Sequence, residues 1–347
     1  MRSWCSARPS TTRCSRRAMA EPVVVGIDGG ATRTRAVVLV DGVPRGRATV
    51  RSASAYHRGP DDAAAVAAEA ARAALAAAGL AGPADALGAG LAGADDPSVR
   101  QRLQIALDAA GLARVVAIDH DAAAALAGGL ALQPGVVVVA GTGSIAFGVD
   151  AMGRRARAGG WGPLLDDEGS GYAVGRAALR AAMRAFDGRG PATALAEAVR
   201  ARFYLVSLAS LKIPARALSV DEIAALAPLA VEAARGGDAV AAGILTAAGE
   251  ALAAMVVAVA RQLGWERVPF ALVAVGGLFE AGDLLRAPLL RALAAAGCTA
   301  RLQPARFPPE IGAALLAAQA AGLEVQRLLT ALAGHDPGHR REEADPR

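Results

Sequence analysis

A chain of 347 residues, with 54% hydrophobic and 20% charged residues, is long enough for two lobes and has a globular rather than a disordered composition. The five arginines of residues 1–20 account for the whole net charge of +5, so the rest of the chain is neutral and lacks the basic stripe expected of a nucleic-acid-binding protein. The three cysteines form no CxxC pair, which argues against a disulfide framework, a zinc site or an iron–sulfur site and fits a reducing cytoplasm.

The two ends of the chain differ in composition from its body. Residues 1–20 are rich in Arg and Ser and lack the apolar core of a secretory signal. We interpret them as an extension that is disordered or precedes a true start at Met19, with a transit peptide as the alternative. The charged residues 335–347 predict a disordered tail. No membrane span is expected, because a Pro-Gly turn interrupts the uncharged residues 122–149 and residues 251–260 are too short.

The first third of the chain predicts alternating strands and helices. Residues 23–27 and 36–40 are β-branched apolar runs on either side of a Gly turn, which predicts a hairpin. Beyond it, the hydrophobic periodicity predicts helices over residues 61–78, 97–110 and 122–132, and strands over residues 87–91 and 115–118.

The strand–turn–strand pattern recurs near the middle of the chain. Residues 136–140 and 145–149 are apolar runs on either side of a second Gly turn. This repetition predicts two related lobes that face each other, each with a hairpin that grips phosphate. The expected lobes are residues 21–133 with 309–334, and residues 134–308. Within the second half we expect a Gly-rich loop at 159–171, helices from 172 to 263, strands at 272–275 and 300–303, and helices at 281–296 and 309–321.

The first turn, Asp28-Gly29-Gly30-Ala31-Thr32-Arg33-Thr34, has the composition of a phosphate-binding loop. Glycines let backbone N–H groups approach phosphate oxygens, and the threonine hydroxyls add donors. Asp28 precedes the turn and can hold Mg²⁺ directly or through water. An ordinary hairpin turn is the alternative interpretation.

The second turn, Gly141-Thr142-Gly143-Ser144, repeats this chemistry, with the same alternative. Two such turns in matching strand contexts support the phosphate interpretation more strongly than either alone. Neither is a Walker A loop, which requires a Lys after the glycines, because Lys212 is the only lysine of the chain. We therefore expect the phosphates between two hairpins rather than on a helix N-terminus.

The Gly-rich loop GGWGPLLDDEGSG contains groups suited to a sugar. Trp161 follows Gly160 and offers an apolar face to a sugar ring, while Asp167 and Glu168 can accept hydrogen bonds from hydroxyls. Asp166 is the acid expected to be merely solvated. A surface loop with a buried tryptophan is the alternative.

Two shorter motifs follow predicted strands. In Asp119-His120-Asp121, a carboxylate at a strand end can take the proton of an attacking hydroxyl, and we favour Asp121 over Asp119. The alternative for each Asp is a helix N-cap, and His120 is expected to be only a neighbour. Gly276 and Gly277 can form a flat surface for an adenine, or an ordinary turn.

In this order, the motifs resemble those of the BadF/BadG/BcrA/BcrD ATPase family, within it the N-acetylglucosamine and glucosamine kinase branch. The resemblance covers residues 23–322. GGWGPLLDDEGSGYAVG is similar to the sugar loop of that branch, DGGATRT and AGTGS to the two phosphate motifs, VAVGGLF to the adenosine motif and PPEIGAALLA to the C-terminal connecting helix. The resemblance implies an α/β fold of the two-lobed actin-like ATPase (ribonuclease H-like) type, with a nucleotide and sugar cleft between the lobes.

The resemblance also implies a role for each matching residue. Asp28 would organise Mg²⁺, and Asp121 would be the catalytic base and contact the sugar. The implied ATP contacts are Gly29, Gly30, Thr32, Arg33, Thr34, Gly141, Thr142, Gly143, Ser144, Gly276 and Gly277. The implied sugar contacts are Gly160, Trp161, Asp167 and Glu168.

One position departs from the family pattern. Many relatives have an Asn that contacts the sugar in a stretch similar to Asn-Tyr-His-Arg, whereas this chain has Ala55-Tyr56-His57-Arg58. The loss of an amide affects selectivity, because unpaired polar groups are costly. Ser54 is a candidate for compensation, and the identity of the sugar stays open.

The resemblance implies a kinase that uses ATP and Mg²⁺ to phosphorylate an amino sugar, N-acetylglucosamine or glucosamine, at O6. The sequence leaves open whether the chain is a monomer or a homodimer, and its cysteines predict the cytoplasm. An ATPase that activates a partner dehydratase is an alternative, although the cysteines do not match the iron–sulfur site of such relatives. A non-catalytic sugar sensor is a further alternative, against which the intact Asp28, Asp121 and Asp167 argue.

Overall fold

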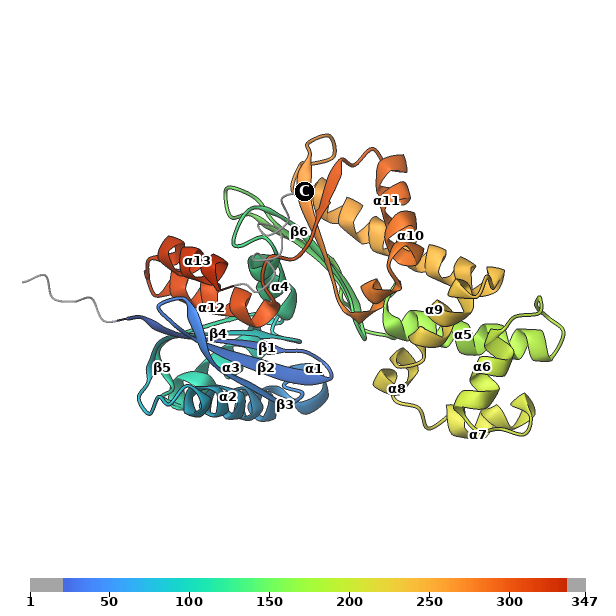
Figure 1. The fold of residues 1–347 in the computed structure, drawn as a ribbon, viewed down its shortest axis with the longest axis horizontal. Helices are drawn as coiled ribbons and strands as arrows, with labels where there is room; N and C mark the ends of the chain where they lie inside the picture. Colours follow the sequence, from blue (N-terminus) through green and yellow to red (C-terminus); the bar gives the residue numbers. More distant parts are fainter. Residues whose placement is uncertain (1–20, 336–347) are drawn as a thin grey trace, which may run out of the picture.

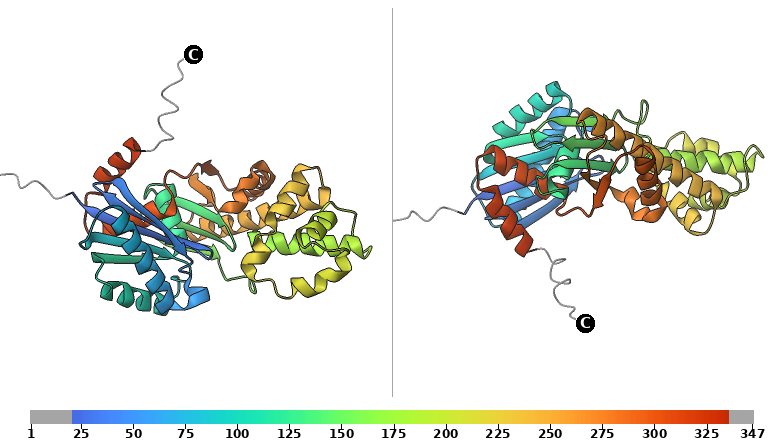
Figure 2. Two further views of the ribbon diagram at one scale, coloured as in Figure 1. Left: turned by 60° about the horizontal axis from the view of Figure 1, so that its bottom comes forward. Right: turned by 90° about the horizontal axis from the view of Figure 1, so that it is seen from above.

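The computed structural model describes residues 21–335, so the predicted N-terminal extension and nearly all of the predicted tail lie outside the described residues. The chain forms two five-stranded sheets flanked by helices, and a helical region extends away from the second sheet (Figures 1 and 2). This arrangement confirms the expected two-lobed α/β fold. The division of the chain between the lobes stays a prediction.

The first sheet has the order β3-β2-β1-β4-β5, with an antiparallel meander of three strands and a parallel set of β1, β4 and β5. Alternate residues of β1 face opposite sides. Val25 and Ile27 face a core formed with α2 and α3, whereas Val24 faces one formed with α12 and α13. The bounds are β1 Val23–Gly29, β2 Arg33–Val40, β3 Val43–Arg51, β4 Ala84–Leu91, β5 Ala113–Asp119, α2 Pro60–Ala77, α3 Pro97–Ala109, α12 Pro309–Ala320 and α13 Val325–Gly334.

The second sheet, with the order β10-β9-β6-β7-β8, repeats this topology. Strands β6, β7 and β8 form an antiparallel meander, and β6, β9 and β10 run parallel. The strand–turn–strand echo in the sequence is therefore a repeat of sheet topology. The bounds are β6 Gly135–Ala140, β7 Ser144–Val149, β8 Arg155–Gly159, β9 Phe270–Val275 and β10 Ala300–Gln303.

Helix α4 (Asp121–Gly129) lies between the sheets and crosses α12 (Figure 1). Its side chains pack with Val137 and Phe147 of the second sheet, while α12 packs on the first sheet. The crossing is close because small residues line it. A Cβ at Gly312 of α12 would lie 2.0 Å from the carbonyl oxygen of Ala124. This contact fixes the start of α4 relative to both sheets.

The helical region follows the Gly-rich loop and packs against the second sheet through α10. By length and composition alone, α10 could cross a membrane, with a mean hydropathy of 1.9 over its most apolar 18 residues, but half of that window is buried inside the protein. Residues 251–260 form an uncharged part of this 24-residue helix, between Glu250 and Arg261. The bounds are α5 Gly171–Phe186, α6 Leu195–Arg202, α7 Lys212–Ala215, α8 Val220–Ala224, α9 Ala227–Arg235, α10 Ala239–Gln262 and α11 Asp283–Ala295.

Two strands, β3 and β8, have no counterpart in the sequence-based expectations. Both are rich in arginine and lie at an end of the antiparallel meander of their sheet. Only Gly46 of β3 is fully buried, so no apolar run marks the strand. The three-residue extension of the expected helix 122–132 is also wrong, because Ala131 and Leu132 adopt positive φ angles beyond the end of α4.

The α4–α12 crossing can be tested with two Gly→Ala substitutions in helices. We expect Gly312→Ala to lower the free energy of unfolding by about 2 kcal/mol, because the new methyl group overpacks the crossing. We expect Gly243→Ala in α10 to raise it by about 0.5 kcal/mol, since a Cβ there meets nothing within 4 Å. Urea unfolding measures both. Equal effects of the two substitutions would contradict the account of the crossing.

Candidate active site

The predicted catalytic residues gather where parallel strands of the first sheet end. Asp28 lies near the end of β1, Asp119 ends β5, and Asp121 begins α4 directly afterwards. The carboxyl ends of parallel strands meet at one edge of a sheet, where ligands of open α/β sheets bind. Asp28 and Asp121 therefore lie within electrostatic reach of each other.

The turn between β1 and β2 is tight and open at its tip. The N–H of Gly30 donates to the carbonyl of Arg33 at 3.2 Å, and the carbonyl of Gly30 accepts a hydrogen bond from the Ser52 hydroxyl at 2.9 Å. Thr32 and Arg33 are exposed. Gly29 leaves no room for a side chain, since a Cβ would lie 2.5 Å from a leucine of β4. The predicted phosphate contacts of the tip are sterically free.

Thr34 differs from the other residues predicted to contact phosphate. It pairs with Gly29 in the ladder between β1 and β2, and its side chain faces the core formed with α2 and α3. Asp28 faces the opposite side of the sheet. The Thr34 hydroxyl is buried and has no hydrogen-bond partner. Its contact with phosphate stays a prediction.

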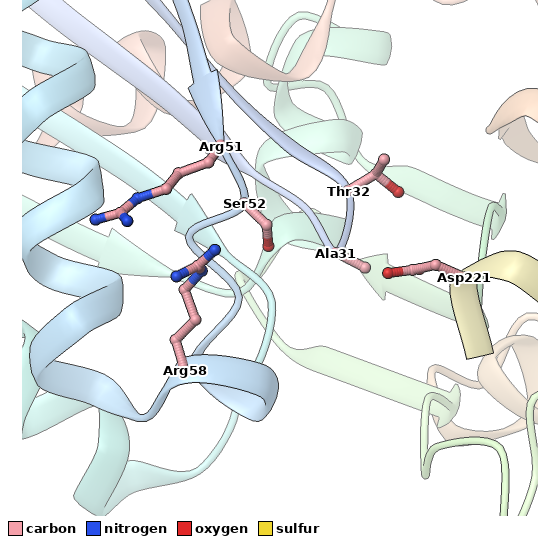
Figure 3. A pocket seen from close by; sticks show the side chains of 6 residues that line it. All are labelled: Ala31, Thr32, Arg51, Ser52, Arg58 and Asp221. Atoms are coloured by element: carbon pink, nitrogen blue, oxygen red, sulfur yellow. The ribbon is translucent and has the colours of Figure 1, made fainter. Parts of the chain in front are cut away.

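The hairpin tip borders a pocket of about 480 Å³ (Figure 3). Arg51 and Arg58 lie on one side and share the carboxylate of Asp62, at 3.6 Å and 2.9 Å. Asp221 of α8 reaches in from the opposite side. The pocket thus lies between the first lobe and the helical region, beside the predicted phosphate turn. Its lining residues are Ala31, Thr32, Arg51, Ser52, Arg58 and Asp221.

The turn between β6 and β7 is joined to the predicted sugar loop. Asp167 accepts a hydrogen bond from the N–H of Ser144 at 3.2 Å, and the Ser144 hydroxyl donates to the carbonyl of Glu168 at 2.7 Å. A Cβ at Gly143 would lie 2.9 Å from the Asp167 carboxylate, so glycine is needed there. The carbonyl of Gly141 accepts from the start of α5 at 2.8 Å. The predicted phosphate turn and sugar loop form one unit.

Asp167 is a strained and buried member of this unit. Its φ of +59° lies in the left-handed region, which is uncommon for a residue other than glycine. Burial raises the pKa of its carboxyl, while the hydrogen bond from Ser144 opposes that rise. Its carboxylate thus holds the second phosphate turn, and the predicted contact with the sugar stays a prediction.

Asp121 is free for chemistry and Asp119 is not. The Asp119 carboxylate accepts hydrogen bonds from the N–H of His120 at 2.8 Å and from Arg155 at 2.6 Å. Among residues 21–335, the Asp121 side chain accepts one hydrogen bond, from the N–H of Ala122 at 2.9 Å. Burial raises the pKa of Asp121 to about 6. A carboxylate with that pKa is matched to work as a general base near neutral pH.

His120 has a role that the sequence did not indicate. It is the N-cap of α4, because its Nδ1 accepts a hydrogen bond from the N–H of Ala123 at 3.2 Å. The ring packs edge-on against Phe147, at 4.4 Å between centroids, and burial lowers its pKa to about 4. Neither aspartate is therefore the N-cap, and a neutral His120 fixes the start of the helix that carries Asp121.

The surroundings of Asp28 fit a magnesium ion. Burial, followed by the charges of Asp121 and Glu310, raises the pKa of Asp28 to about 7, although Arg35 lies 3.6 Å away. One oxygen of the buried Glu310 carboxylate has no hydrogen-bond partner. Within residues 21–335, no three acidic, His or Cys side chains converge to bind a metal directly. A hydrated cation held by Asp28 would relieve this repulsion.

The sugar loop presents Trp161 to solvent, so the alternative of a buried tryptophan is wrong. The side chain is 62% exposed, and the guanidinium of Arg157 lies 4.3 Å from its ring centroid. Gly160 needs a positive φ of 73°, and a Cβ would lie 2.9 Å from Ile145. Glu168 is exposed, as a ligand contact requires.

The predicted adenosine motif lies beside the second phosphate turn. Gly276 has a φ of +110°, and a Cβ there would lie 2.3 Å from the carbonyl oxygen of Ala140, which directly precedes the turn. Gly277 has open space where a side chain would be. Gly276 therefore allows two backbone segments to pack closely, and Gly277 leaves the surface beside them free of a side chain.

Several polar residues of the cleft were not predicted. Arg155 and Arg157 lie on β8, which has no apolar signature. Asp95 bonds with Tyr56 and Arg157, and Asp221 lines the pocket from α8. No sequence pattern marks these residues, because their partners are distant in the chain.

Comparison with known proteins agrees with this geometry. Residues 25–317 match the model of the BadF/BadG/BcrA/BcrD ATPase family. The chain belongs to that family. Among curated relatives of this ATPase, the N-acetyl-D-glucosamine kinase of Dictyostelium discoideum is 31% identical over 86% of this chain and 98% of its own length. The N-acetylmuramic acid/N-acetylglucosamine kinase of Clostridium acetobutylicum is 35% identical over 55% of this chain, and the match spans 63% of that protein.

Solved structures of other proteins have the same architecture. A candidate N-acetylglucosamine kinase from Chromobacterium violaceum is 30% identical, with a TM-score of 0.70 over 85% of this chain and 99% of that one. A ROK family glucokinase from Streptomyces griseus is 21% identical with a TM-score of 0.55, over 86% of this chain and 99% of its own. The likeness to the glucokinase shows the fold alone. Both structures confirm the expected actin-like fold class.

The free carboxylate of Asp121 leads us to predict that turnover depends on this residue. We expect Asp121→Asn to lower turnover by orders of magnitude while nucleotide still binds, and kcat/KM to fall below about pH 6 as the base is protonated. Steady-state assays with nucleotide titration measure both. Near-normal turnover of Asp121→Asn, together with inactive Asp119→Asn, would assign the base to Asp119.

The raised pKa of Asp28 predicts a stability effect. Its pKa of about 7 in the folded state exceeds the ordinary aspartate value of 3.8, so the folded state loses stability as pH rises between these values. Without Mg²⁺, we expect Asp28→Asn to raise the free energy of unfolding at pH 8 by up to about 4 kcal/mol, and much less at pH 4. Denaturant unfolding measures this, with Asp108→Asn on the surface as control. A destabilised Asp28→Asn at pH 8 would contradict the account.

Proposed function

We propose that this ATPase is a sugar kinase, which transfers the γ-phosphoryl group of ATP to the O6 hydroxyl of N-acetylglucosamine or a related amino sugar. The observation that carries the proposal is the carboxylate of Asp121, which lies at the carboxyl edge of the first sheet with a pKa of about 6. An ATPase that transferred phosphate only to water would not need an exposed tryptophan loop tied to its phosphate turn. The names of both curated relatives support N-acetylglucosamine as a substrate.

In this mechanism the chain mainly positions its two substrates. The turns after β1 and β6 hold the phosphates through backbone N–H groups. Trp161 stacks against the sugar ring. Asp121 accepts the O6 proton as the oxygen bonds to the γ-phosphorus, the bond from phosphorus to the bridging oxygen breaks, and ADP leaves. Mg²⁺ held through Asp28 would supply charge neutralisation on the β- and γ-phosphates.

The substrate proposal can be tested with a sugar panel. Purified protein with ATP and Mg²⁺ would be assayed for ADP release with N-acetylglucosamine, glucosamine, N-acetylmannosamine, N-acetylmuramic acid, glucose and no sugar. We expect strong release with one amino sugar and a product heavier by one phosphoryl group. Asp121→Asn is the matched control, because it should abolish release in every well.

Two other outcomes would contradict the proposal. Equal release in all wells, including the one without sugar, would identify an ATPase that serves another partner. Sugar binding without any product would identify a sensor. A requirement for Mg²⁺ is tested in the same assay by chelation, which should abolish release, and readdition of Mg²⁺, which should restore it.

A further inference from the structure

Two arginines of β8 join the second sheet to the first. Arg155 and Arg157 are two residues apart and face the same side of the strand. Arg155 pairs with Asp119 at the end of β5, at 2.6 Å. Arg157 pairs with Asp95, which follows β4 in the first lobe. Both ion pairs thus bridge the sheets at the edge where Asp121 lies.

The two pairs differ in what else the arginine touches. The guanidinium of Arg157 stacks on the ring of Trp161, at 4.3 Å from the centroid, while that of Arg155 lies 4.9 Å from the ring of the core residue Phe147. The side chains of Arg157 and Asp95 are 23% and 22% exposed, so the charges are partly shielded from water. Arg157 therefore connects an aspartate of one lobe to the exposed tryptophan of the other.

Asp95 also binds the residue that follows the departure from the family pattern. The hydroxyl of Tyr56 donates to Asp95 at 2.8 Å, and the N–H of Ala55 donates to the carbonyl of Ala92 at 2.9 Å. Ala55 and the loop that carries Asp95 are therefore adjacent. The Ser54 hydroxyl is buried without a partner, so it does not reach the cleft as compensation for the missing amide.

These residues are linked both to the predicted base and to the predicted stacking surface. The charge of Asp95 contributes to the raised pKa of Asp121, and that of Asp121 to the raised pKa of Tyr56, which places the three groups within electrostatic reach. On the other side, Arg157 connects Asp95 with Trp161. We therefore expect a sugar that stacks on Trp161 and presents a hydroxyl to Asp121 to lie near Asp95 and Tyr56.

We infer that Arg157 is a positioning residue for the sugar, because it holds Trp161 of the second lobe in place against Asp95 and Tyr56 of the first. The inference rests on the proposed kinase function. The guanidinium of Arg157 fixes the orientation of the Trp161 ring. The same group binds Asp95, which in turn binds Tyr56 beside Ala55. Trp161 therefore forms one sugar site with Asp95 and Tyr56 only when the contact of Arg157 with Asp95 joins the two lobes.

The test compares Arg157→Gln with Arg155→Gln, which removes an ion pair between the same sheets without touching Trp161. We expect Arg157→Gln to raise the KM for the sugar by roughly tenfold, because the substitution removes a partly desolvated cation–π contact and an ion pair. The KM for ATP should stay within about twofold of wild type. Arg155→Gln should not raise the KM for the sugar more than the KM for ATP. Arg157→Lys, which keeps the charge and loses the planar stack, should restore only part of the sugar affinity.

A second measurement follows Trp161 without any substrate. In a chain with Trp4 and Trp265 changed to Phe, acrylamide quenching reports Trp161 alone. Arg157→Gln should raise the quenching constant, and Arg155→Gln should leave it unchanged. The inference is overturned if the two variants behave alike in quenching and in the KM for the sugar. If the wild-type protein phosphorylates no sugar, the proposed function fails instead, and the quenching result alone then decides whether Arg157 positions Trp161.

Discussion

The close crossing of α4 and α12 is the constraint on which the candidate active site depends. Gly312 lets α12 approach the backbone of α4, and α12 in turn packs on the first sheet. The other side of α4 covers the second sheet. Because Asp121 is the first residue of α4, one packing contact sets the position of this proposed base relative to both sheets. The neutral N-cap His120 completes this arrangement by fixing where the helix begins.

Charge is the second organising feature of the cleft. Asp28, Asp121 and Glu310 are acidic groups in electrostatic contact, and burial adds to the cost of ionising Asp28 and Asp121. Arginines at the periphery offset part of this charge, as in the pairs of Arg35 with Asp28 and Arg47 with Glu310. A site with unrelieved negative charge at its centre is suited to a cation and to proton transfer rather than to a stable apo state. The acidic groups thus lower the stability of the folded state at the place where the chemistry is proposed to occur.

Much of the fold could be predicted because short stretches of the sequence specify its strands, turns and helices. The turn at Gly29-Gly30 and its echo at Gly141–Ser144 were visible as glycines between apolar runs, and the structure has a hairpin at each. Strands β3 and β8 were missed because arginines interrupt their apolar pattern. The contact of Arg157 with Asp95 could not be predicted, since the two residues are 62 positions apart and no local pattern links them. The role of His120 depends on a single N–H of the next turn, which the sequence alone does not specify.

The central claim is that Asp121, the two phosphate turns and Trp161 form one kinase site. A crystal structure with N-acetylglucosamine and a non-hydrolysable ATP analogue tests this claim most directly. We predict that O6 of the sugar lies about 2.6–3.2 Å from the Asp121 carboxylate, with the ring stacked on Trp161 and the γ-phosphate between the two turns. A sugar bound away from Trp161, or with no hydroxyl within hydrogen-bond distance of Asp121, would contradict it.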